Sequence, residues 1–177
     1  MHPFGTLHVS VLCLLLTCIP QPTYATDEEC LRSALQKMIG SFNAKGRAIG
    51  DDGVMRPFSQ SYAVSSPASD TVIISSGGIS YGRWQLLAGR YTFTGFNRDG
   101  SAKHAPVEVT YTCSHLGHSD TYILKEEWSA RPGNGAEKWR YFQRRAISTD
   151  AQRVFTQFKE EGSNLPYYVY SVFEAAK

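Results

Sequence analysis

The sequence predicts an α+β fold in which one N-terminal helix packs on a curved, cone-like antiparallel sheet of about six strands. Residues 26–45 place apolar side chains at helical spacing. Residues 81–174 consist largely of β-branched and aromatic residues in near-alternating order, separated by turn formers. Because an amphipathic helix is not stable alone, we expect its apolar stripe to cover one face of the sheet.

The first 25 residues have the pattern of a secretory signal peptide. Val9–Ile19 is an apolar run too short to span a bilayer, and Thr23-Tyr24-Ala25 supplies small residues of the kind that a signal peptidase reads. No Lys or Arg precedes the run, which departs from the usual pattern. We therefore expect a secreted, extracellular protein with one α+β domain over residues 26–177 and no attachment to a membrane.

The net charge restricts the class of partner, and the cysteine content bears on the cellular compartment. The formal net charge is +2 and the charges are not clustered, which argues against a nucleic-acid partner. Removal of the leader takes away Cys13 and Cys18 and leaves Cys30 and Cys113. In an oxidising compartment such a pair is most simply one disulfide, and two separate buried thiols are the alternative.

The helix is expected over residues 26–45, followed by Gly46. Thr26 is a natural N-cap, and Glu29 three positions later completes a capping box. The apolar stripe consists of Leu31, Leu35, Met38, Ile39 and Phe42.

The strands are expected from alternation and turn signals. Residues 84–96 carry aromatic side chains on both faces, which predicts either a central strand covered on both sides or a strand bent at Gly89. Tyr122, Leu124, Glu126 and Trp128 share one face of a later strand. The strands are expected near residues 54–64, 72–74, 84–96, 106–113, 121–128, 139–147, 153–159 and 167–174.

Four short stretches resemble the NTF2-like (SnoaL-like) superfamily. They are Ser41–Lys45, Asp51–Pro57, Gly89–Phe96 with Asp99-Gly100, and Lys138–Arg140. The resemblance implies a sheet wrapped around a helix, a cone-shaped apolar pocket, and dimers formed through the open sheet face. None of the superfamily's variable catalytic Asp and His residues can be matched here residue by residue. The alternative fold is a lipocalin-type β-barrel, because Gly82-Arg83-Trp84 is similar to the lipocalin Gly-x-Trp, although it lies mid-chain.

The candidate site residues are those expected to line the pocket. Glu126 shares a face with apolar residues, so a buried carboxylic acid there is a candidate general base. Arg90 also lies among apolar neighbours and is expected to meet Glu126 or a ligand carboxylate. An exposed face with a surface salt bridge is the alternative, and the aromatic residues suit a plain core or a subunit interface equally. The candidate ligand-binding residues are Arg90, Tyr91, Phe93, Tyr122, Trp128 and Tyr141.

His115, His118 and Asp120 lie close together in sequence and are ordinary zinc or copper ligands. A structural metal site usually needs four ligands, and Gly117 and Asp120 suit a polar hairpin turn. We therefore expect neither a metal nor a cofactor.

These observations lead to two hypotheses of different class. The first is a secreted, non-catalytic binding protein that takes a small apolar ligand in the cone or a protein partner, including a second copy of itself, across the sheet. The alternative is a SnoaL-like cyclase or isomerase-type enzyme with Glu126 as general base.

Overall fold

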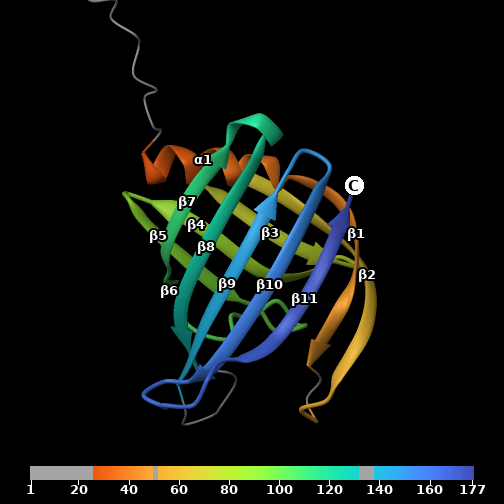
Figure 1. The fold of residues 1–177 in the computed structure, drawn as a ribbon, viewed down its shortest axis with the longest axis vertical. Coiled ribbons are helices and arrows are strands. Elements are labelled where there is room, and N and C mark those ends of the chain that lie inside the picture. Colours follow the sequence, from red (N-terminus) through yellow and green to blue (C-terminus); the bar gives the residue numbers. More distant parts are fainter. Residues whose placement is uncertain (1–25, 50–51, 132–137) are drawn as a thin grey trace, which may run out of the picture.

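A computed structural model describes residues 26–49, 52–131 and 138–177. In these ranges the chain forms one α-helix, one short 3-10 helix and eleven β-strands (Figure 1). Their bounds are α1 Asp27–Lys37, β1 Gly40–Ile49, β2 Met55–Ala68, β3 Thr71–Ser76, β4 Ile79–Leu87, β5 Arg90–Gly95, β6 Val107–Glu108, β7 Thr110–Leu116, η1 Gly117–Ser119, β8 Thr121–Ala130, β9 Trp139–Ile147, β10 Ala151–Glu160 and β11 Tyr168–Ala176. No helix in this part of the chain has the length and apolar content needed to cross a membrane.

All eleven strands belong to one antiparallel sheet with the order β6-β5-β4-β3-β2-β1-β11-β10-β9-β8-β7. Sequence neighbours pair except for β6 and β7, and β1 pairs with β11, which joins the two ends of the chain in the middle of the sheet. The sheet curls on itself so that its two edge strands, β6 and β7, are joined by Val109 alone (Figure 1). Val109 is buried, and its N–H donates to the Tyr91 carbonyl of β5 at 2.8 Å. The result is a nearly closed barrel with a seam beside Val109.

The prediction of an α+β cone with about six strands is therefore wrong. The described residues contain one helix of 11 residues and a strand-dominated barrel of eleven strands. The lipocalin-type barrel kept as the alternative is nearer to this architecture, although the strand number and the N-terminal helix differ from that expectation. The sheet curls far enough to bring its two edge strands to either side of Val109, which an open sheet of six strands would not do.

The helix is shorter than predicted, because residues 40–49 form β1. Its start was predicted correctly: Thr26 caps the helix and Glu29 completes the capping box. The chain leaves the helix at Gly40, whose φ of 143° lies in a region that other residues rarely adopt. Beyond it Phe42 and Ala44 are buried while Ser41 and Asn43 are exposed, which is the two-residue period of a strand.

Helix α1 lies across one end of the barrel (Figure 1). Its Leu31, Ala34 and Leu35 are buried and join the core formed by the inner faces of the strands. The predicted disulfide is confirmed: Cys30 of α1 is bonded to Cys113 of β7. The helix thus closes one end of the barrel, and the bond ties it to an edge strand.

The segment 84–96 is a hairpin and not a single central strand. Of the two alternatives predicted for it, the bend at Gly89 is the nearer one. Ala88 and Gly89 both have positive φ and form the turn between β4 and β5. Trp84 therefore pairs with Phe93, and Leu86 with Tyr91, so all four face the barrel interior. When residues 84–96 are read as one strand, alternation places Trp84 and Leu86 on one face and Tyr91 and Phe93 on the other.

Candidate functional site

The barrel interior contains two adjoining cavities of about 370 Å³ and 540 Å³. They share part of their lining, namely Tyr81, Trp84, Gln143, Tyr170 and Ser171. The smaller cavity lies between the inner faces of β1, β2, β9, β10 and β11, and the larger one continues toward β5 and β8. Together they form one candidate binding site inside the barrel.

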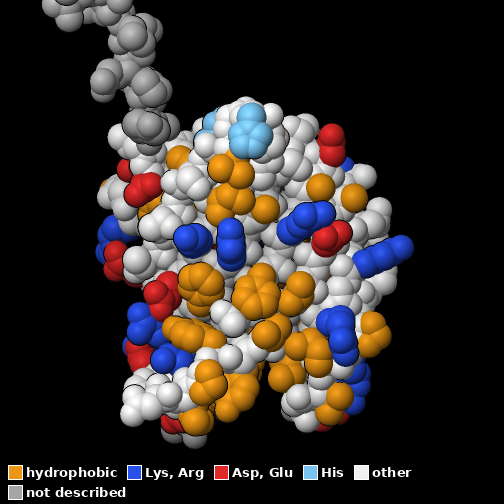
Figure 2. All heavy atoms as spheres, viewed as in Figure 1, with side chains coloured by type: hydrophobic (Ala, Val, Ile, Leu, Met, Phe, Trp, Pro, Cys, Tyr) orange, Lys and Arg blue, Asp and Glu red, His pale blue; other side chains and the backbone are white. Residues whose placement is uncertain are grey.

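The site opens at the end of the barrel opposite α1, where β1 and β11 separate. Their pairing ends at Ala48 and Ser171, so the first residues of β11 have no partner in β1. Tyr81 and Tyr170 at this end are 45% and 44% exposed although they line the cavities. Figure 2 shows the same region as a hollow at the lower edge of the molecule, with hydrophobic side chains gathered on both sides. A ligand can therefore enter between aromatic side chains.

A buried ion pair lies at the deep end of the site, with Arg145 in the cavity wall and Glu126 behind it. Glu126 of β8 and Arg145 of β9 are 1% and 3% exposed, and Arg145 Nε donates to Glu126 Oε2 at 2.8 Å. The Tyr91 hydroxyl donates to the other carboxylate oxygen, Oε1, at 2.7 Å. Burial, together with the neighbouring Glu126 carboxylate, raises the pKa of Tyr91 well above its usual value. Tyr91 therefore stays protonated and remains a donor.

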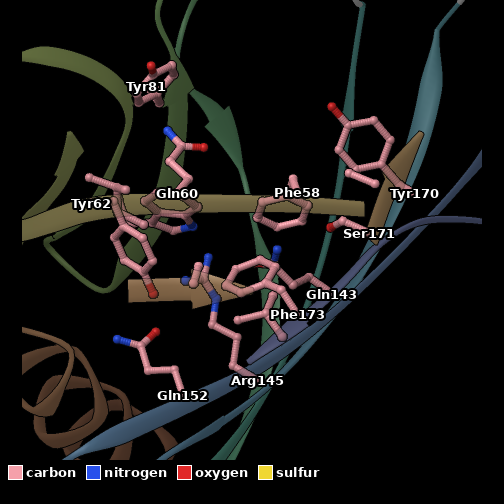
Figure 3. A pocket seen from close by; sticks show the side chains of 15 residues that line it. Phe58, Gln60, Tyr62, Tyr81, Gln143, Arg145, Gln152, Tyr170, Ser171 and Phe173 are labelled. Carbon is pink, nitrogen blue, oxygen red and sulfur yellow. The ribbon is translucent and has the colours of Figure 1, made fainter. Parts of the chain in front are cut away.

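Arg145 is held so that part of its guanidinium faces the cavity. Its side-chain hydrogen bonds to described residues use only Nε, so the two terminal nitrogens have no partner among those residues, and Arg145 lines the smaller cavity. The guanidinium carbon lies 4.6 Å from the centre of the Trp84 ring, and this cation–π contact further restrains the orientation of the guanidinium. In Figure 3 Arg145, Tyr62 and Gln152 lie at one end of the smaller cavity, and Tyr81 and Tyr170 lie at the other.

Two buried polar atoms at the junction of the cavities have no hydrogen-bond partner among the described residues: Trp84 Nε1 and Gln143 Oε1. Gln143 uses its amide nitrogen to donate to Thr156 Oγ1 at 2.8 Å, which leaves its oxygen free. Buried polar groups are nearly always satisfied in folded proteins. Trp84 and Gln143 line both cavities, so an unpaired donor and an unpaired acceptor belong to side chains of the shared wall.

The Tyr62 hydroxyl adds a further polar group near Arg145. Burial in the cavity wall raises its pKa to about 12, and the Arg145 charge acts in the opposite direction. The ring of Tyr62 stacks on Phe42 with centres 5.3 Å apart, which fixes its position.

Aromatic rings line the larger cavity in a continuous series. Trp84 contacts Phe93, Phe93 contacts Trp128, and Trp128 stacks on Tyr141 at an interplanar angle of 10°. The ring centres lie 4.6–5.4 Å apart. Rings in contact with one another form a continuous apolar wall, against which an apolar guest can pack.

The structure separates the six predicted ligand-binding residues into two groups. Phe93, Trp128 and Tyr141 line the larger cavity. Tyr91 is buried behind the cavity wall on Glu126, and Tyr122 stacks on His115 beneath Lys37, so neither lines it. Arg90 is outside the site: its side chain is 70% exposed and faces Glu108 at 3.6 Å.

Glu126 is buried on the face that was predicted for it, with Leu124 and Trp128. Its partner is Arg145 and not Arg90. Both carboxylate oxygens are occupied, by Tyr91 and by Arg145, and Glu126 is not among the residues that line either cavity.

Sequence reasoning did not identify Arg145 or Trp84 as site residues. A signal was present for Arg145, because Trp139, Tyr141 and Gln143 alternate on one face and Arg145 is the next residue of that series. No such signal existed for Trp84, since its place in the cavity depends on the hairpin turn at Ala88 and Gly89.

His115 and Asp120 meet at the α1 end of the barrel, with 3.3 Å between Nε2 and Oδ1. Asp120 also pairs with Lys37 of the helix. No group of three or more potential ligands is close enough to hold a metal among the described residues. The segment acts as the turn between β7 and β8.

Comparison with known proteins identifies a similar fold and gives no information on function. No family model matches the chain, and no curated protein matches it in sequence. Among solved structures the chain is similar to Rv2717c from M. tuberculosis, with a TM-score of 0.51 and 13% identity over 81% of this chain and 96% of that one. At this identity the similarity concerns the fold alone.

The resemblance to NTF2-like (SnoaL-like) domains is thus wrong. Ser41–Lys45, taken as a helix end, lies in β1, and the barrel matches a solved structure of another kind. The short motifs behind it are turn and strand starts that many antiparallel sheets share.

Proposed function

We propose that this protein binds a small molecule with a largely apolar, aromatic body inside the barrel. The observation that carries the proposal is the pair of adjoining cavities, lined mostly by aromatic and aliphatic side chains and containing two unpaired buried polar atoms. Ligand sites typically have volumes of roughly 300–1,000 Å³ and combine apolar walls with a few convergent polar groups. Both cavities fall within that range.

Binding of Nile Red, an uncharged dye that brightens in apolar surroundings, tests the proposal. Ala48 lies at the mouth of the smaller cavity, so Ala48→Trp should fill the entrance. Ala176→Trp on the exposed side of the same sheet is the matched control. We expect wild type and Ala176→Trp to bind the dye equally and Ala48→Trp to bind at least about tenfold more weakly, or about 1.4 kcal/mol. Equal binding by all three would place the dye outside the barrel and refute the proposal.

We further propose that the protein is secreted. The Cys30–Cys113 bond supports an oxidising compartment. The leader pattern of residues 1–25 lies outside the described residues and is tested by the mass of the protein recovered from culture medium. A homodimer or a protein partner also stays a prediction, and native mass spectrometry of that sample reports both oligomeric state and retained ligand.

The second candidate function is catalytic, and the observation that favours it is the burial of Glu126 beside the site. A carboxylate general base next to a carbonyl held by Arg145 would take an α-proton from the ligand, and the enolate oxygen would be stabilised by the guanidinium. Glu126 can act in this way only if one of its two partners moves aside, since both oxygens are bonded.

Exchange of the methyl protons of 2-acetylnaphthalene in deuterated water tests this second function. Catalysis predicts accelerated exchange in wild type and none above background in Glu126→Gln or Ala48→Trp. An exchange rate equal to that of the buffer in wild type would refute a general-base role while leaving the binding proposal intact.

A further inference from the structure

We infer that the ligand's inner end is uncharged and carries a carbonyl oxygen, with a carboxamide as the best match. This inference rests on the proposed binding function and adds the chemical class of the group that meets Arg145, Trp84 and Gln143. It follows from the charge balance and from the hydrogen bonds left unmade at the deep end of the site.

The charge balance at the deep end excludes a net attraction for anions. Arg145 is the cation that faces this end of the cavity, and Glu126 already neutralises it at 2.8 Å. The two neighbouring titratable groups, Tyr62 and Tyr91, have pKa values raised by burial and are therefore neutral at physiological pH. A ligand carboxylate placed here would add a second buried negative charge without a second cation, and desolvating it costs free energy that nothing nearby returns.

Cationic residues do occur around the larger cavity, but at its mouth. Lys103 and Arg131 are exposed, and His104 beside them is half-buried. Charges in contact with water are strongly screened, so they favour the approach of an anion more than its deep burial. Charge at the mouth therefore does not decide the chemistry at the inner end.

The unmade hydrogen bonds specify the group that fits. Two kinds of donor belong to side chains that line the smaller cavity, namely the terminal nitrogens of Arg145 and the indole N–H of Trp84. A carbonyl oxygen has two lone pairs and accepts from both. The unpaired Gln143 Oε1 needs a donor, which the N–H of a carboxamide supplies. A carboxylate would accept hydrogen bonds from Arg145 and Trp84. It has no N–H to donate to Gln143 Oε1, so two partially negative oxygens would face each other.

The walls define the rest of the molecule. The aromatic series runs from Trp84, which contacts Arg145, through Phe93 and Trp128 to Tyr141 along the wall of the larger cavity. A flat ring system carrying one carboxamide thus matches the site from its inner end to its mouth.

Three naphthalenes of nearly the same shape test the inference: 2-naphthamide, 2-naphthoate and 2-isopropylnaphthalene. They present an uncharged acceptor and donor, an anion at neutral pH, and no polar atom. Calorimetry or ligand fluorescence should show 2-naphthamide binding at least tenfold more tightly than 2-naphthoate and at least fivefold more tightly than 2-isopropylnaphthalene. The tightest binding by 2-naphthoate, or equal binding by all three, would overturn the inference.

A charge change in the protein gives an independent readout. In Glu126→Gln the guanidinium loses its counter-charge, so the preference should move by at least tenfold toward 2-naphthoate. Gln143→Leu removes the unpaired acceptor and should weaken 2-naphthamide binding while leaving 2-isopropylnaphthalene unchanged. An unaltered preference in both variants would overturn the inference.

The outcomes separate this inference from the function on which it rests. If Nile Red binds in wild type and is lost in Ala48→Trp while 2-naphthamide shows no advantage, the cavity binds ligands but the carboxamide assignment is wrong. If neither Nile Red nor any naphthalene binds, the proposed function itself fails and the inference fails with it.

Discussion

Glu126→Gln should destabilise the protein strongly, because it leaves the Arg145 charge buried without a partner. The two side chains are 0% and 4% exposed, so little water is available to replace the carboxylate. The substitution keeps the size of the side chain and one hydrogen-bonding oxygen. The measured loss therefore reports charge and not packing.

The magnitude follows from the separation and burial of the pair. Two unit charges about 4 Å apart attract by about 4 kcal/mol at an effective dielectric constant of about 20. Removing one partner of a buried pair typically costs about 3–5 kcal/mol, which agrees with this figure. For a chain of this length each kcal/mol lowers the midpoint of thermal unfolding by about 2–4 °C, so the expected loss is about 6–20 °C.

Urea unfolding followed by circular dichroism measures the effect directly. The matched control is Glu174→Gln, which breaks the Arg153–Glu174 pair at 2.9 Å on the outer surface, where both side chains are more than 70% exposed. This control should lose less than about 1 kcal/mol. Arg145→Met and the double variant complete a cycle, and the double variant should lose less than the sum of the two single losses.

The reasoning fails if Glu126→Gln loses no more stability than Glu174→Gln. That result would mean that water reaches the pair, and that Arg145 is not held in a neutral, dehydrated site. A fully additive cycle would lead to the same conclusion.

Three further predictions concern other parts of the fold. Replacing Cys30 and Cys113 by Ser should cost about 4.5 kcal/mol in urea unfolding, since the bond closes a loop with a sequence separation of 83. Gly46→Ala should weaken the β1–β11 pairing and lower the thermal midpoint, because the added Cβ would lie 2.2 Å from the Val172 carbonyl oxygen, whereas Gly117→Ala has open space and should change little. The pKa of Tyr62, raised to about 12 by burial, means that the folded state holds a proton that the unfolded state releases near pH 10. This contribution to stability is complete below about pH 10 and is lost as the pH rises through about 12, so Tyr62→Phe should flatten the alkaline fall in stability seen by urea unfolding.

Local patterns in the sequence predicted the local structure well. The capping box at Thr26 and Glu29, the Cys30–Cys113 bond and the shared face of Leu124, Glu126 and Trp128 all follow from spacing of a few residues or from the count of cysteines, and the structure contains each of them. Alternation beyond Gln143 would also have indicated Arg145. These features depend on interactions whose partners are visible in the sequence pattern itself.

The fold class was wrong where one residue changes the period of the pattern. Ile39 and Phe42 extend a helical stripe on paper, but Gly40 turns the chain into β1, and that strand then pairs with β11 across the whole length of the sequence. Likewise, a turn at Ala88 and Gly89 reverses the faces of every residue after it. Closure of the barrel and the meeting of Trp84 with Arg145 are consequences of such long-range pairing, which no local pattern contains.

Tyr91→Phe tests whether Glu126 also stabilises the seam of the barrel. The Tyr91 hydroxyl reaches from β5 to Glu126 on β8, next to the point where Val109 connects the two edge strands. Removing it leaves one oxygen of a buried carboxylate unpaired, which should cost about 1.5–3 kcal/mol. Hydrogen exchange should then increase first at the Val109 amide, while the preference for 2-naphthamide over 2-naphthoate should persist because Arg145 keeps its partner. Loss of that preference without faster exchange would show that Tyr91 acts on the ligand site and not on the seam.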